Sequence, residues 1–185
     1  MKKLKISITG CLGRMGQQTI KSANKNRNIN IVTLTENKKT NKKISNILPQ
    51  KNSKGAFKNT SVIIDFSTPK CTLEVLKIAS KINKKIVIGT TGFSTKQENL
   101  IKKYAKKIPI LKAGNMSLGI NLLMYFAEIS SKSLGKNYLF KIFESHHKYK
   151  KDHPSGTALM LGKGIAIGKN KNFKKIKGKI YLNKK

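Results

Sequence analysis

Residues 4–16 read LKISITGCLGRMG, a short apolar stretch that runs into glycines at every third position. The pattern of Leu4–Thr9 predicts a β-strand, and that of Gln17–Asn24 predicts a helix directly after the glycine turn. A strand, a glycine turn and a helix in this order are typical of the first unit of a Rossmann-type sheet. This stretch therefore predicts a Rossmann-type fold.

The same alternation continues downstream. Further strands are predicted at 29–35, 61–66, 85–89 and 108–112, and helices at 69–82, 95–107 and about 117–133. The polar segment 37–59 is expected to be a loop with at most one short helix. Near-continuous apolar runs such as Val62-Ile63-Ile64 are typical of strands covered on both faces. The prediction is an α/β fold with a parallel sheet and helices on both faces.

The pattern changes near residue 134. A strand of mixed facing is predicted at 138–144, followed by a histidine-rich loop and a helix at about 155–167. We therefore expect a dinucleotide-binding domain at 1–134 and an incomplete α+β substrate domain at 135–185.

The charge is extreme, because 40 lysines and arginines against 7 acids give a net +33. Only Arg14 and Arg27 are arginines, and the lysines are scattered along every segment, a composition that AT-rich codons produce. Specific nucleic-acid readers add arginine forks and exposed aromatics, so specific nucleic-acid binding is not favoured. Electrostatic binding that weakens steeply with salt stays as an alternative.

Two cysteines, Cys11 and Cys71, are too few and too isolated for a disulfide framework or a zinc site. The N-terminal apolar stretch is too short for a signal peptide, and no segment reaches membrane-spanning length. We expect a soluble, cytoplasmic protein that does not bind membranes.

The glycine turn indicates a nucleotide. A pyrophosphate needs backbone amides at a helix N-terminus with no side chain in between, and the turn provides glycines at the required places. Glu36, twenty residues after Gly16, follows the second strand, where a carboxylate can accept hydrogen bonds from ribose hydroxyls. Glu36 favours NADH, whereas Arg14, Lys38 and Lys39 could neutralise the 2′-phosphate of NADPH, so both cofactors stay open.

Two more tight turns follow predicted strands, GTTGF at 89–93 and AGNM at 113–116. Either could be an ordinary strand-to-helix turn or helix cap. Their place at the carboxyl edge of the sheet, where such folds bind ligands, favours a functional interpretation.

All three histidines lie in ESHHKYKKDHPSGTA, residues 144–158. This segment couples proton-transfer groups to a helix start whose amides favour a carboxylate. A metal site is disfavoured because the nearby acids are few and the surrounding lysines would repel a divalent cation. The alternative for any single residue is a solvated histidine or lysine. The segment is typical of a site for an anionic small molecule that is protonated as well as reduced.

Five blocks in order, GCLGRMG, DFS, GTTGF, AGNMSLGIN and ESHHKYKKDHPSGTAL, resemble the 4-hydroxy-tetrahydrodipicolinate reductase family of lysine and diaminopimelate synthesis. The resemblance implies an oxidoreductase that reduces 4-hydroxy-tetrahydrodipicolinate with NADH or NADPH, and a homotetramer. It implies His146 and Lys150 as catalytic proton-transfer residues, and His147, Gly156 and Thr157 as substrate contacts. It implies these cofactor contacts: Gly10, Cys11, Leu12, Gly13, Arg14, Met15, Glu36, Gly89, Thr90, Thr91, Ala113, Gly114, Asn115 and Met116.

The chain departs from the family in two places. Asn37 stands where many relatives carry an arginine for the 2′-phosphate, which weakens any expected preference for NADPH. Relatives also continue beyond the position of Lys185, so we expect a C-terminally truncated reductase with low activity. The alternatives are a non-catalytic nucleotide-binding remnant and another GxxGxxG dehydrogenase of amino-acid metabolism.

Overall fold

The computed structural model describes residues 3–135, 137–146 and 154–176. The chain forms two compact units that divide between Gly114 and Asn115, here called unit 1 and unit 2. The sequence had placed this boundary after residue 134. The difference arises because the helix predicted at 117–133, α5 (Leu118–Ser133), packs against α6 (Gly156–Gly168), a helix of the second unit.

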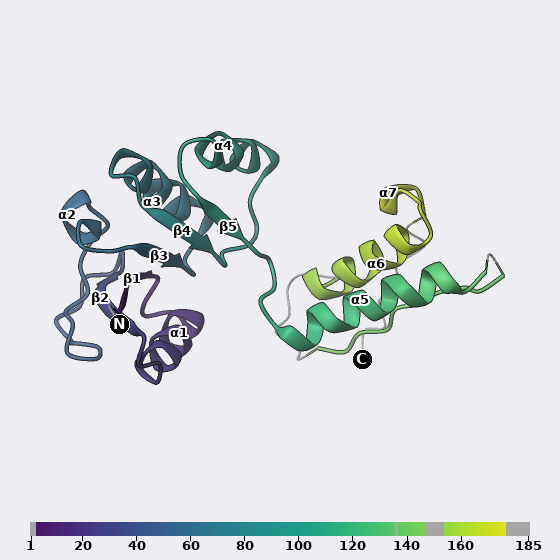
Figure 1. The fold of residues 1–185 in the computed structure, drawn as a ribbon, viewed down its shortest axis with the longest axis horizontal. Coiled ribbons are helices and arrows are strands. Elements are labelled where there is room, and N and C mark those ends of the chain that lie inside the picture. The colour runs from purple at the N-terminus through teal and green to yellow at the C-terminus, as the bar shows by residue number, and fades with distance from the viewer. Residues whose placement is uncertain (1–2, 136, 147–153, 177–185) are drawn as a thin grey trace. The chain divides into compact units, whose positions relative to one another are not determined.

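Unit 1 is a five-stranded parallel sheet in the order β2-β1-β3-β4-β5. Helix α1 covers one face and helices α3 and α4 cover the other (Figure 1). The α/β prediction is therefore confirmed, and the segment expected to be a loop contains the short helix α2. The strands are β1 (Leu4–Thr9), β2 (Ile29–Thr35), β3 (Val62–Asp65), β4 (Lys85–Ile88) and β5 (Ile110–Lys112), and the helices are α1 (Arg14–Asn24), α2 (Lys54–Phe57), α3 (Pro69–Lys81) and α4 (Thr95–Ala105).

The core of unit 1 lies on both faces of the sheet. Ile63 packs with Val75 and Leu76 of α3, whereas its neighbour Ile64 packs against the cluster of Ile8 and Ile20 on the face of α1. Successive side chains of a strand point to opposite faces, so a doubly covered strand needs apolar residues at consecutive positions. This explains the continuous apolar run of β3.

The carboxyl ends of the strands lie level. Thr9 pairs with Thr35 and with Asp65, and Asp65 pairs with Ile88 in the next strand. The chain order reverses at β1, which lies between β2 and β3. Open parallel sheets bind ligands beside such a reversal, at the carboxyl ends of the strands.

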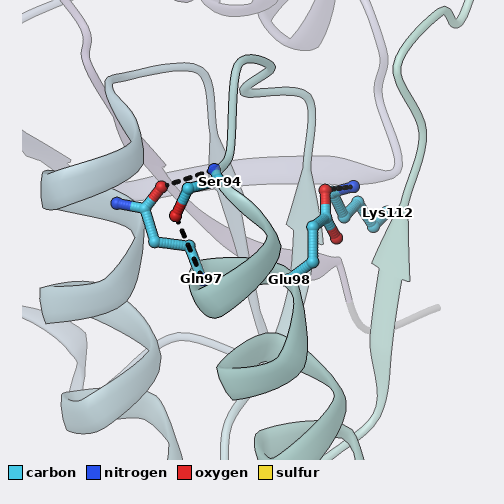
Figure 2. A network of polar contacts seen from close by, with 4 residues as sticks. All are labelled: Ser94, Gln97, Glu98 and Lys112. Atoms are coloured by element: carbon cyan, nitrogen blue, oxygen red, sulfur yellow. Dashed lines mark hydrogen bonds and ion pairs between the residues drawn. The ribbon is translucent and has the colours of Figure 1, made fainter.

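The start of α4 is fixed by a capping box and an ion pair, both drawn in Figure 2. The Ser94 hydroxyl accepts from the Gln97 amide at 3.4 Å, and the Gln97 side chain accepts from the Ser94 amide at 2.8 Å. Lys112 of β5 donates to Glu98 at 2.7 Å and lies 5.3 Å from the ring centre of Phe93. These contacts join the GTTGF turn to the neighbouring strand.

Unit 2 consists of α5, α6 and the short helix α7 (Phe173–Ile176) in its described residues. The helix predicted at 155–167 is confirmed as α6, but the strand predicted at 138–144 is not formed. No strand of the described part of unit 2 lies beside this segment to complete a ladder of hydrogen bonds. Instead, the Lys169 ammonium donates to the carbonyls of Gly135 at 3.4 Å and Tyr138 at 3.3 Å.

Candidate nucleotide and substrate sites

Close backbone contacts in the glycine turn after β1 leave no room for a side chain at Gly10 or Gly16. Gly10 has a φ of +75°, and a Cβ placed on it would lie 2.3 Å from the carbonyl oxygen of Phe66. A Cβ on Gly16 would lie 2.1 Å from the Gly10 carbonyl oxygen. Helix α1 therefore packs directly on the turn, with Gly13 as its N-cap residue. Its first amides are available to an anion.

Glu36 lies beside this turn, as its spacing predicts. Its Oε2 accepts from the Leu12 amide at 3.1 Å, and its Oε1 accepts from the Asn37 amide at 2.9 Å. The carboxylate is thus held at the junction of β1 and β2, where a ribose would reach it. Arg14 and Met15 lie in the same turn and line the cavity described below.

Cys11 differs from its neighbours in the turn because its side chain is fully buried in the core cluster with Ile6 and Ile20. Burial, followed by the charge of Glu36, raises the pKa of the Cys11 thiol to about 11. Leu12 and Met15 remain 40% and 53% exposed. A ligand at this turn would therefore meet only the backbone of Cys11.

A cavity of about 270 Å³ opens at the carboxyl edge of the sheet. The loops after β1, β3 and β4 form its walls. A Cβ on Gly89 would lie 2.0 Å from the Phe66 ring, so the aromatic side chain covers the end of β4 only because residue 89 is glycine. The lining residues are Gly13, Arg14, Met15, Phe66, Ser67, Gly89, Thr90 and Thr91.

Two of these lining residues, Phe66 and Ser67, were not among the predicted contacts. Asp65 was not predicted either, although it is fully buried and accepts hydrogen bonds from the hydroxyls of Ser67, Thr72 and Thr90. The available signal was the DFS block at the end of a strand next to the reversal point. An acidic residue at the end of an apolar strand, at this edge of the sheet, can accept hydrogen bonds from the loops around it.

The predicted contacts at 113–116 are divided between the two units. Ala113 and Gly114 end unit 1, whereas Asn115 and Met116 begin unit 2. The Asn115 side chain accepts from the Ser117 amide at 2.8 Å, and Ser117 caps α5. None of these four residues lines the cavity at the glycine turn. The local geometry of this block is that of a helix cap, which was the alternative interpretation of its sequence.

In unit 2, Glu144 joins the histidine segment to the start of α6. Its Oε2 lies 2.8 Å from Nε2 of His146, and its Oε1 accepts from the Ser155 amide at 2.9 Å. The His146 and Glu144 side chains are 27% and 24% exposed. Hydrogen bonds from Ser155, followed by the one from His146, lower the pKa of Glu144 to about 2. A carboxylate on one ring nitrogen fixes the orientation of the imidazole.

Helix α6 begins beside this pair. The hydroxyl of Ser155 accepts from the Ala158 amide at 3.1 Å, and Gly156 and Thr157 form the first turn. Among the described residues, no atom would lie within 4 Å of a Cβ on Gly156. The predicted residues His147 and Lys150 lie outside the described residues.

Neither a membrane span nor a metal cluster is found in the part of the chain that the structure describes. No helix there is long and apolar enough to cross a membrane. No group of three or more histidine, cysteine, aspartate or glutamate residues is placed there to hold a metal ion.

A parallel sheet with this strand order, a glycine turn after its first strand and an acid after its second defines a Rossmann-type dinucleotide-binding protein. Two sequence models, "Dihydrodipicolinate reductase, N-terminus" and "Dihydrodipicolinate reductase, C-terminus", match residues 4–116 and 119–184. The chain belongs to the dihydrodipicolinate reductase family.

Individual relatives agree. A 4-hydroxy-tetrahydrodipicolinate reductase of Pelagibacter ubique is 64% identical over all of this chain, which spans 72% of that protein. One from Buchnera aphidicola is 44% identical, with 94% of this chain and 68% of that protein covered. The solved structure of a dipicolinate-bound dihydrodipicolinate reductase from Paenisporosarcina matches 99% of this chain and 71% of that one, with a TM-score of 0.72 and 25% identity.

Proposed function

We propose that this chain reduces 4-hydroxy-tetrahydrodipicolinate to tetrahydrodipicolinate with a nicotinamide dinucleotide, a step of lysine and diaminopimelate synthesis. The observation that carries this proposal is the 64% identity, over the entire chain, to a 4-hydroxy-tetrahydrodipicolinate reductase. The geometry of both units supports it, because unit 1 has a cavity at the glycine turn and in unit 2 Glu144 joins His146 to the start of a helix.

Unit 1 fits a dinucleotide. Glycines occupy the positions where a Cβ would collide with the turn, so the first amides of α1 would face a bound anion without an intervening side chain. The residues that would hold the nucleotide are those of the turn, 10–15, together with Glu36 and the loop 89–91. A bound nicotinamide dinucleotide supplies the hydride for the reduction.

Glu36 supports a preference for NADH. Its carboxylate, which the Leu12 amide already holds, would accept from ribose hydroxyls and repel a 2′-phosphate. Arg14, Lys38 and Lys39 are the nearby cations that would make NADPH acceptable. We therefore propose that both nucleotides bind, NADH more tightly.

Unit 2 supplies the acid–base groups in this proposal. His146, oriented by Glu144, transfers a proton during the reduction, and the matching positions give Lys150 as a proton donor. The start of α6, at Gly156 and Thr157, holds a carboxylate of the substrate through backbone amides and the positive end of the helix dipole. His147 completes the substrate contacts.

Self-association through unit 2 is also part of the proposal. Several large apolar side chains of this unit are open to solvent, among them Leu118 at 84%, Leu139 at 80% and Phe143 at 89%. Apolar surface of this kind is typical of a subunit contact.

The test is nucleotide oxidation by the purified full chain, followed by absorbance, with and without the cyclic dicarboxylate. We expect oxidation that requires the dicarboxylate and is faster with NADH than with NADPH at low nucleotide concentration. His146→Ala should lower kcat by about 10²- to 10⁴-fold while leaving the Kd of NADH unchanged.

Two outcomes would contradict this proposal in different ways. Binding of NADH without any turnover would point to the nucleotide-binding remnant. Oxidation with homoserine, and none with the dicarboxylate, would point to another dehydrogenase.

A further inference from the structure

Asp65 is the last residue of β3 and is fully buried, yet no base of the described residues forms an ion pair with it. Its partners are hydroxyls. Ser67 Oγ donates to Oδ1 at 2.6 Å, and Thr72 and Thr90 both donate to Oδ2, the latter at 2.9 Å. Burial raises the pKa of Asp65, although these hydrogen bonds oppose the rise. A buried carboxylate is costly, so an apolar residue would serve a purely structural role at lower cost.

The hydrogen bonds have a fixed direction. The Thr90 hydroxyl accepts from the Ser67 amide at 2.9 Å, and it has a single hydrogen, which it donates to Asp65. The backbone repeats the link, because the Gly89 amide donates to the Asp65 carbonyl at 2.9 Å. The loop after β3 and the loop after β4 are thus bound to one carboxylate and to each other.

Both loops line the cavity at the reversal point of the sheet, whereas Asp65 itself does not. Phe66 and Ser67 contribute from one side, and Gly89 to Thr91 from the other. A substitution of Asp65 would therefore affect a bound ligand only by changing the conformation of these loops.

We propose that Asp65 is a positioning residue of the nucleotide site, which sets the two loops 66–67 and 89–91 in the conformation that binds the dinucleotide. This role rests on the proposed function of unit 1. It deepens that function by assigning affinity for the nucleotide to a residue that makes no contact with the cavity.

Thr72 provides a matched control. Its hydroxyl donates to the same oxygen, Oδ2 of Asp65, but it comes from α3 and does not line the cavity. Removing it takes away one hydrogen bond from the carboxylate without detaching either loop. If Asp65 had a merely structural role, Asp65→Asn and Thr72→Val would both lower Tm and would both leave the Kd of NADH unchanged.

The experiment measures the Kd of NADH by fluorescence titration, and Tm by circular dichroism, on the full chain and five variants. Asp65→Asn and Thr90→Val should each weaken NADH binding by about tenfold or more. The double variant should bind NADH no more weakly than whichever single variant binds it less tightly. Both changes break the same hydrogen bond, from Thr90 to Asp65, so their effects should not add. Thr90→Ser should restore the wild-type Kd. Thr72→Val should lower Tm and leave the Kd within about twofold.

The outcomes separate the two proposals. Wild-type affinity in Asp65→Asn, or a loss of affinity in Thr72→Val equal to that in Thr90→Val, overturns the positioning role while nucleotide binding stands. Additive losses in the double variant overturn it as well. A wild-type chain that binds neither NADH nor NADPH overturns the proposed function, and the role of Asp65 with it. If Asp65→Asn does not fold, Ser67→Ala, which removes the bond to Oδ1, replaces it with the same expectation.

Discussion

Glu144 holds two parts of unit 2 together through one side chain. One carboxylate oxygen orients His146 and the other accepts from the Ser155 amide, so the proposed proton-transfer residue and the helix start are held by the same side chain. The sequence showed this acid only as a neighbour of the histidines. Its position explains why the segment 144–146 and the start of α6 lie side by side without a strand between them.

The lowered pKa of Glu144 predicts a loss of stability in acid. The carboxyl has a pKa of about 2 in the folded chain against 4.5 ordinarily, so its contribution is complete above pH 4.5 and is lost as the pH falls toward 2. Glu144→Gln should remove this part of the pH dependence. Acid titration followed by circular dichroism measures it, and salt should weaken it because the group is partly exposed.

A control for this titration is Glu128→Gln, which removes an equal charge from α5. It separates the loss of one negative charge from the loss of the hydrogen bonds that Glu144 accepts. An unchanged transition in Glu144→Gln would contradict the prediction.

Both cysteines are predicted to be unreactive in the folded chain. Burial raises the pKa of Cys11 to about 11, so at pH 8 only about one thiol in a thousand is ionised. Burial also raises the pKa of Cys71, whose sulfur accepts from the Asn52 side chain at 3.3 Å. Mass spectrometry after iodoacetamide treatment should show no labelling before denaturation and two labels after it. Rapid labelling of Cys11 in the native chain would show that the glycine turn opens.

Helices α5 and α6 approach closely because glycines face the backbone of α5. A Cβ on Gly168 would lie 2.1 Å from the Glu128 carbonyl oxygen and from Ser131 Oγ. Gly168→Ala should therefore lower the free energy of unfolding of unit 2 by about 1 to 3 kcal/mol. Denaturant unfolding followed by circular dichroism measures this loss.

The matched control is Gly119→Ala in the exposed first turn of α5, where the nearest atom would be 4.0 Å away. Alanine is the better helix former by about 1 kcal/mol, so this variant should be neutral or more stable. Equal destabilisation by both alanines would argue against close packing at Gly168.

The capping box of α4 should matter more than the ion pair beside it (Figure 2). Ser94→Ala removes the cap and should cost about 1 kcal/mol of unfolding free energy. Glu98→Gln breaks the ion pair with Lys112. The side chains of Glu98 and Lys112 are 37% and 31% exposed, so this variant should lower the free energy of unfolding by less than about 1 kcal/mol. Thermal unfolding of the two variants in low and high salt measures the difference. Only the effect of Glu98→Gln should depend on salt.

For the whole molecule, the net charge of +33 opposes self-association while the apolar residues of unit 2 favour it. Added salt screens the repulsion, since the Debye length falls to about 10 Å at 0.1 M. Sedimentation should therefore show larger species as the salt concentration rises. Leu139→Glu in unit 2 should reduce this association, whereas Leu111→Glu, at a site 62% exposed in unit 1, should not. A monomer at every salt concentration would contradict the prediction.

Most elements of unit 1 could be predicted from the sequence because each depends on neighbouring residues. Apolar runs give the strands, Thr68 and Ser94 cap the helices that follow, and the glycine turn admits no side chain. The strand expected at 138–144 was wrong, because a strand also needs a partner that its own residues cannot supply.

By itself, the sequence determined the α/β class, the glycine turn with Glu36, and the family to which the chain belongs. Only the tertiary structure decided that α5 packs with α6, that Cys11 points into the core, and that Asp65 binds the loops around the cavity. The physical reason is the distance along the chain between the residues that interact. Strands, turns and caps are set by interactions within a few residues, whereas these three features depend on contacts between segments far apart in the chain.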